Sequence, residues 1–138
     1  MKKTIEQIFA ESIEVKQETL KKNLLQIIGA SEAIISAFKS GHKLFFCGNG
    51  GSAADSQHIA AEFVGRFQKE RKAWPAIALT TDSSALTALG NDYTFDIVFS
   101  RQLQALGQKG DVLIAISTSG NSKNVLEAVK QAVSKPKA

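Results

Sequence analysis

Two polar turns in the sequence contain the residue types that bind phosphate groups. Gly48-Asn-Gly-Gly-Ser52 follows one short apolar run, and Ser117-Thr-Ser-Gly-Asn-Ser122 follows another. Glycines let the backbone turn sharply and approach a ligand, whereas clustered hydroxyls donate hydrogen bonds to phosphate oxygens. If a helix follows each turn, the free N–H groups of its first turn also favour an anion. The two turns together predict a site for a phosphorylated ligand.

The first turn does not match a nucleotide-binding motif. No Gly-Lys-Ser/Thr follows the first turn, as a Walker A loop requires, and its three glycines do not have the GxGxxG spacing. A plain strand-to-helix turn is the alternative for Gly48–Ser52, and a solvated serine-rich loop is the alternative for Ser117–Ser122. Ser52 is expected to be the N-cap of the next helix, with Asp55 completing a capping box.

A second set of polar residues follows the first turn. His58 and Glu62 are four residues apart, so they share one face of a helix. An imidazole and a carboxylate at this spacing can perform acid–base chemistry or bind a divalent metal ion, and an ordinary surface pair is the alternative. A third polar cluster, Gly90-Asn91-Asp92, is interpreted as a turn after a short helix that could contact the ligand.

Strands and helices must alternate for these residues to meet. Three unbroken apolar runs predict strands over 43–47, 76–80 and 111–117, each buried on both faces as in a parallel sheet. Between and after them, helices are predicted over 53–67, 83–89, 95–106 and 122–133. This alternation predicts an α/β fold. Both turns would then lie at the carboxyl ends of parallel strands, where open α/β sheets bind ligands.

The N-terminal part of the chain predicts a long amphipathic helix over residues 3–28. Its apolar side chains recur at helical spacing and are Ile5, Ile8, Phe9, Ile13, Leu20, Leu24 and Ile28. A second helix is expected to be capped by Ser31 and to end at Gly41. A helix of this length needs a surface to cover, which favours a homo-oligomer.

Length and composition exclude several classes of protein. A chain of 138 residues fits a single domain. The net charge of +4 comes without a basic stripe interleaved with aromatics, so no nucleic-acid partner is expected. Because no apolar run is long enough for a membrane span or a signal peptide, we expect a cytoplasmic protein with no membrane partner. The single cysteine, Cys47, excludes an internal disulfide and is expected to be a buried structural thiol.

Taken together, the motifs resemble those of the phosphoheptose isomerases. The segments that carry the resemblance are Gly48–Ser52, His58–Phe67, Gly90–Asp92 and Ile116–Ser122. These sugar-isomerase (SIS) domain proteins convert sedoheptulose 7-phosphate to D-glycero-D-manno-heptose 7-phosphate, in heptose biosynthesis for lipopolysaccharide. The resemblance covers the whole chain. It implies a three-layer SIS-type fold, an enediol proton transfer, and a homotetramer with its sites near subunit interfaces.

The resemblance also implies roles for individual residues. Glu62 would be the catalytic base, and it would share a zinc ion, one per subunit, with His58. The Ser117–Ser122 turn would hold the phosphate group of the substrate. Contacts to the sugar phosphate are implied for Asn49, Gly50, Gly51, Ser52, Glu62, Asn91, Asp92, Ser117, Thr118, Ser119 and Ser122.

One departure from the family concerns the C-terminal third of its fold. The family continues with further strands, a Gln and a His that complete the metal site and the acid–base pair. These residues have no counterpart before Ala138, so we expect one SIS domain over 1–138 whose C-terminal part is absent. The alternative function is a non-catalytic SIS module that senses sugar phosphates or binds a replication initiator. The presence of Glu62 favours the enzyme.

Overall fold

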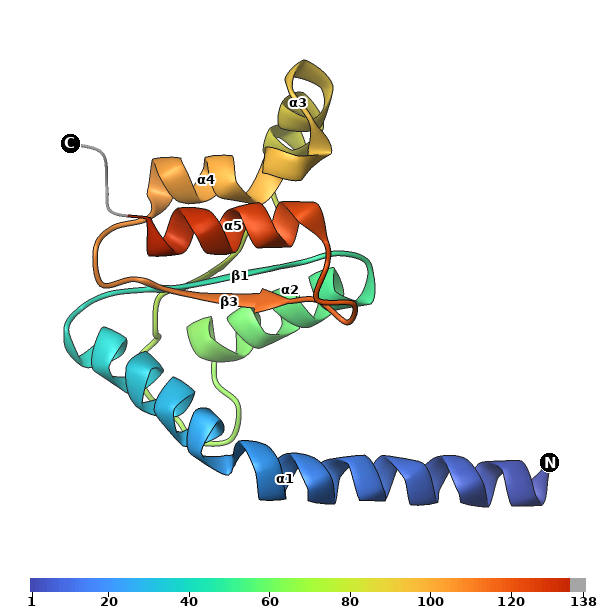
Figure 1. The fold of residues 1–138 in the computed structure, drawn as a ribbon. Helices are drawn as coiled ribbons and strands as arrows, with labels where there is room; N and C mark the ends of the chain where they lie inside the picture. Colours follow the sequence, from blue (N-terminus) through green and yellow to red (C-terminus); the bar gives the residue numbers. More distant parts are fainter. Residues whose placement is uncertain (135–138) are drawn as a thin grey trace. The chain divides into compact units, whose positions relative to one another are not determined.

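Helices and strands alternate along the chain in the computed structural model, which describes residues 1–134 (Figure 1). The elements are α1 (Lys2–Lys39), β1 (Leu44–Gly48), α2 (Gly51–Val64), β2 (Ala76–Ala78), α3 (Ser83–Asp92), the 3-10 helix η1 (Phe95–Ile97), α4 (Val98–Leu106), β3 (Val112–Ile116) and α5 (Lys123–Val133). The predicted α/β class is therefore confirmed. The helix predicted over 95–106 is divided into η1 and α4.

The three strands form one parallel sheet in the order β2-β1-β3. Leu44 of the central strand lies opposite Ala76 on one side and Val112 on the other. Every residue of β1 is buried, as predicted, whereas β2 and β3 are only partly buried. The difference arises because each outer strand pairs with one strand only within the described residues. The prediction of full burial was wrong for these two strands.

Helices cover both faces of the sheet, which gives three layers (Figure 1). Side chains of β1 alternate between the faces, as strand geometry requires. Phe46 stacks on Phe63 of α2, with the ring centroids 6.0 Å apart. On the other face, Phe45 and Cys47 belong to a core completed by Leu79 and by Val98, Phe99, Leu103, Val125 and Ala128 from α4 and α5.

Cys47 lies in this core and has no exposed surface. Burial raises the pKa of its thiol to about 11, because a thiolate is poorly solvated there. The prediction of an unreactive structural thiol is consistent with this environment.

The N-terminal region is a single helix rather than the two predicted. Ser31 does not cap a second helix, because its hydroxyl donates to the carbonyl of Ile27 at 2.8 Å within α1. Gly41 does follow the helix end, with φ at +78°, as predicted. Residues Met1–Ile35 form one compact unit, and a second begins at Ser36. In the first unit, the apolar side chains are largely exposed.

Among residues 1–134, no helix combines the length and apolar character needed to cross a membrane.

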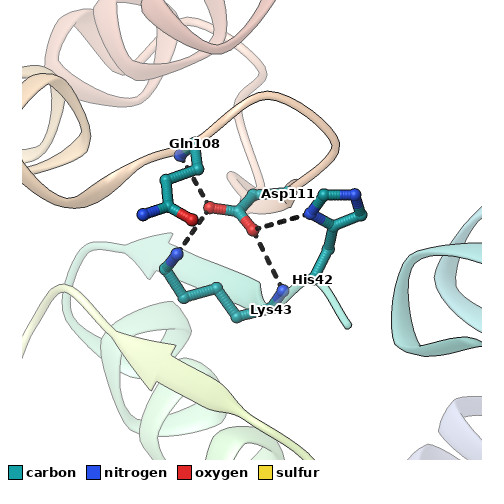
Figure 2. Close-up of polar contacts among 4 residues, drawn as sticks. All are labelled: His42, Lys43, Gln108 and Asp111. Atoms are coloured by element: carbon teal, nitrogen blue, oxygen red, sulfur yellow. Dashed lines mark hydrogen bonds and ion pairs between the residues drawn. The ribbon is translucent and has the colours of Figure 1, made fainter. Parts of the chain in front are cut away.

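The Asp111 carboxylate joins the amino ends of β1 and β3 (Figure 2). One oxygen accepts from the backbone N–H of Lys43 at 3.0 Å, and the other from that of Gln108 at 2.7 Å. Lys43 Nζ lies 2.8 Å from Asp111 Oδ2, and His42 Nδ1 lies 3.8 Å from Asp111 Oδ1. This cluster fixes the starting register of the two strands at the edge of the sheet opposite the two polar turns.

Candidate functional site

The two phosphate-type turns lie at the same edge of the sheet. Gly48, the last residue of β1, is paired with Ile116, the last residue of β3. A turn and a helix follow each strand: α2 follows β1, and α5 follows β3 (Figure 1). The parallel register therefore brings together two segments that are almost 70 residues apart in sequence, as predicted.

The first turn starts its helix earlier than expected. Gly50 is the N-cap of α2, with φ at +55°, a conformation that glycine adopts without strain. Ser52 is instead a buried residue of the first helical turn, so the predicted capping box with Asp55 is absent. The Ser52 and Ala53 N–H groups already donate to the carbonyls of Asn49 and Gly50, both at 3.0 Å. Fewer of these groups are free for an anion than the sequence predicted.

The second turn gathers its hydroxyl groups. Ser117 Oγ lies 3.4 Å from Ser119 Oγ and 3.2 Å from Ser122 Oγ. Backbone N–H groups point at the same oxygens, because Gly120 donates to Ser117 Oγ and Asn121 to Ser119 Oγ. Thr118 is exposed beside them. Three hydroxyls, two of which lie within hydrogen-bond distance of Ser117 Oγ, can reorient to donate to one tetrahedral anion.

A reciprocal amide pair connects the first turn to α5, the helix that follows the second turn. Asn49 Nδ2 donates to Asn124 Oδ1 at 2.9 Å, and Asn124 Nδ2 donates to Asn49 Oδ1 at 2.8 Å. Asn124 is only 3% exposed. Sequence reasoning did not identify it, although one signal was available: it precedes Ala128 by four residues and so lies on the apolar face of α5.

The predicted histidine and carboxylate share a face of α2. His58 Nε2 lies 3.9 Å from Glu62 Oε1, and their side chains are 74% and 34% exposed. This pair fits two ligands of a divalent ion. No third His, Cys, Asp or Glu joins them within residues 1–134. A helix rises 1.5 Å per residue, which places Glu62 about 16 Å along α2 from Gly51. One chain therefore does not bring Glu62 next to the two turns.

Arg71 holds the end of α2 that carries Glu62. Its guanidinium donates to the backbone carbonyls of Glu62 at 2.6 Å and Phe63 at 2.9 Å, and it stacks 4.2 Å from the centroid of the Trp74 ring. The planar guanidinium, with donors on both terminal nitrogens, suits neighbouring carbonyls at a helix end, where intrahelical partners are missing, and the Phe63 carbonyl also accepts from the Trp74 N–H at 3.1 Å. Sequence reasoning missed both Arg71 and Trp74, because their contacts depend on how the 65–75 segment folds back.

Asn91 and Asp92 lie in the last turn of α3, rather than in a turn after a helix ending at residue 89. Both are exposed, and Asn91 Nδ2 donates to Asp92 Oδ1 at 2.9 Å. No hydrogen bond within residues 1–134 joins them to either phosphate-type turn. Their contact with a ligand therefore stays a prediction.

A cavity of about 450 Å³ lies at the other edge of the sheet, near the loop between α4 and β3. The Asp111 carboxylate, which lines it, is already bound by Lys43 and by backbone N–H groups. None of the predicted site residues lines this cavity. The chemistry of the chain therefore points to the edge with the two turns.

The chain is similar to known proteins over most of its length. The SIS domain family model matches residues 7–135. Phosphoheptose isomerase from Neisseria gonorrhoeae (strain NCCP11945) is 60% identical over 124 residues, which are 90% of this chain and 63% of that protein. The phosphoheptose isomerase of Aquifex aeolicus (strain VF5) is 55% identical over 132 residues, which are 96% and 69% of the two chains.

Solved structures agree with this relationship. The structure of phosphoheptose isomerase from Neisseria gonorrhoeae superposes with a TM-score of 0.87 at 53% identity, over 95% of this chain and 68% of that one. The structure of a phosphoheptose isomerase from Francisella tularensis superposes with a TM-score of 0.89 at 41% identity. The match covers 94% of this chain and 68% of that one. The chain thus spans about two thirds of the length of its relatives. With a match over nearly all of its residues, this chain belongs to the SIS-domain family of phosphoheptose isomerases.

Proposed function

We propose that the protein is a cytoplasmic aldose–ketose isomerase that converts sedoheptulose 7-phosphate to D-glycero-D-manno-heptose 7-phosphate for lipopolysaccharide synthesis. The observation that carries the proposal is the convergence of the Ser117, Ser119 and Ser122 hydroxyls at the edge where the glycine-rich turn also ends. This arrangement suits a phosphate group with a sugar beside it. The identity of 55–60% to proteins named phosphoheptose isomerase supports the same substrate.

The proposed chemistry assigns a role to each part of the site. The serine turn binds the 7-phosphate, and the Asn49–Ser52 turn contacts the sugar. Glu62 removes the proton from C1 of the ketose, which gives an enediol, and then returns a proton to C2 while the O1 proton is transferred to O2. The carbonyl thereby moves from C2 to C1 with no net oxidation. A positioned carboxylate is a suitable group for this shuttle.

Zinc is the proposed cofactor, with His58 and Glu62 as two of its ligands. Their 3.9 Å separation on one helix face is compatible with a shared ion. When bound, such an ion supplies positive charge for the oxygens of the reacting carbons. His58 and Glu62 are held by α2, whose end Arg71 fixes through the Glu62 carbonyl.

A homotetramer is part of the same proposal. Glu62 lies about 16 Å along α2 from the first turn, so a carboxylate from another copy would be needed next to the bound sugar if the enzyme works as proposed. The largely exposed apolar side chains of Met1–Ile35 support association between copies. Sites near subunit interfaces would satisfy both observations.

Replacing Glu62 tests the enzyme directly. In the intact protein, we expect Glu62→Gln to lower kcat for sedoheptulose 7-phosphate by at least about 10²-fold, because the amide cannot accept the proton. Calorimetry should still detect binding of the sugar phosphate. Glu127→Gln is the matched control, since Glu127 pairs with Lys130 on the exposed side of α5. Turnover by Glu62→Gln close to that of the wild type would contradict the proposed role.

A non-catalytic SIS module is the second candidate. The observation in its favour is that Glu62 of the same chain lies about 16 Å along α2 from the first phosphate-type turn. Such a protein would sense sugar phosphates or bind a replication initiator. A wild-type protein that binds sedoheptulose 7-phosphate and never turns it over would favour this candidate.

A further inference from the structure

We infer that Asn124 is a positioning residue: it holds the Asn49 side chain and thereby couples the sugar turn to the phosphate turn. The inference rests on the proposed function for its choice of ligand. Its physical basis is the amide pair between Asn49, in the turn after β1, and Asn124, in α5. The two asparagines are 75 positions apart in the sequence.

The Asn124 side chain makes three hydrogen bonds in a buried place. Its Nδ2 donates to Asn49, and its Oδ1 accepts from Asn49 Nδ2 and from the Val125 N–H at 3.0 Å. No buried side-chain nitrogen or oxygen in the described part of the chain lacks a partner. Leaving one of these amides unpaired would cost free energy, so the pair strongly favours a single orientation of both side chains.

Asn49 has little freedom apart from this pair. Its backbone carbonyl accepts from Ser52 N–H at 3.0 Å, which ties it to the first turn of α2. The preceding Gly48 is packed so closely that an added Cβ would lie 2.7 Å from Ser52 Cβ. With its backbone held by α2 and its side chain held by α5, Asn49 has a fixed distance to the serine turn.

The serine turn does not depend on Asn124 in the same way. Its hydroxyls bond to one another and to the Gly120 and Asn121 N–H groups, all within residues 117–122. Breaking the amide pair should therefore release the sugar turn while the phosphate contacts persist. A general loosening of α5 would weaken both parts of the site equally, which distinguishes the two possibilities.

The test compares two ligands on one variant. Calorimetry measures the affinity of Asn124→Ala for sedoheptulose 7-phosphate and for inorganic phosphate. We expect about a tenfold loss of affinity for the sugar phosphate, the size of one lost hydrogen-bonded contact, and less than a twofold change for phosphate. Gln131→Ala removes an amide from the same helix away from both turns and should change neither affinity.

A double-mutant cycle tests whether Asn124 acts through Asn49. If it does, the double variant Asn49→Ala, Asn124→Ala binds the sugar phosphate no more weakly than Asn49→Ala alone. Additive losses, or an equal loss for both ligands, would overturn the inference and leave the proposed function intact. Wild-type protein that binds phosphate but shows no preference for the sugar phosphate would overturn both. If Asn124→Ala does not fold, Asn124→Ser takes its place in the double-mutant cycle, and the same outcomes support or overturn the inference.

Discussion

At the scale of single residues, Asp111 shows how one buried carboxylate depends on its surroundings. Burial alone raises its pKa. The Lys43 ammonium, together with the N–H groups of Lys43 and Gln108, outweighs burial and holds the pKa below its ordinary value of 3.8. Because the folded protein binds this proton less readily than the unfolded chain, ionised Asp111 stabilises the fold above the ordinary pKa. That stabilisation is lost as the pH falls through the lowered value.

Asp111→Asn should therefore change both the stability and its pH dependence. We expect the variant to lose about 2 kcal/mol of unfolding free energy at pH 7, the size of hydrogen bonds to a charged group. It should also lose less stability than the wild type as the pH falls from 5 to 2. Urea unfolding across this range measures both effects. Asp55→Asn, an exposed carboxylate, should leave the pH profile as in the wild type.

At the scale of elements, the sequence predicted which segments form strands and helices, but several ends were wrong. α1 continues through Gly29 because an interior glycine costs only about 1 kcal/mol in a helix, and Ser31 bonds back to the previous turn. α2 begins at Gly51 because Gly50 adopts a positive φ. In both places, local signals for a cap were present, and the backbone conformation of neighbouring residues decided the outcome.

The tight turn between β1 and α2 permits a paired test with two glycines. Gly48→Ala should destabilise the fold by about 1–3 kcal/mol, because the new Cβ would lie 2.7 Å from both Cβ and the carbonyl oxygen of Ser52. Gly29→Ala should stabilise it by about 0.5–1 kcal/mol, since nothing lies within 4 Å of its added Cβ and alanine favours the helix. Chemical denaturation of the two variants measures the difference. Equal stability of Gly48→Ala and the wild type would show that the turn can relax.

The candidate site was predictable where it depends on the ends of strands. The two turns follow β1 and β3, and parallel pairing alone brings them together. The Asn49–Asn124 pair was not predictable, because it depends on the exact register of the sheet. The hydrogen bonds from Arg71 to the end of α2 were not predictable either, because they depend on how a loop folds. The separation of Glu62 from the turns follows from the length of α2 between Gly51 and Glu62, since each helical residue adds about 1.5 Å along the axis.

At the scale of the whole molecule, the Met1–Ile35 unit carries a stripe of apolar side chains. Phe9, Ile13, Leu20, Leu24 and Ile27 fall within one narrow face of the helix, and each is 45–65% exposed. Apolar side chains left exposed in this number typically mark a surface that associates with another protein. The proposed tetramer would bury this stripe between copies, and helices meeting along such a face pack by interdigitating side chains.

Charges placed on the stripe should therefore dissociate the oligomer. We expect the intact wild-type protein to sediment with four times the mass of one chain, and the double variant Phe9→Glu, Leu20→Glu to sediment with a smaller mass, because a buried unpaired carboxylate is strongly unfavourable. Val15→Glu is the control, since Val15 is 64% exposed and lies on the opposite face of the helix. Fluorescence of Trp74, the only tryptophan, reports whether the unit that begins at Ser36 stays folded. A double variant that keeps the wild-type mass would exclude this stripe as the subunit interface, whereas dissociation with unchanged fluorescence would identify it.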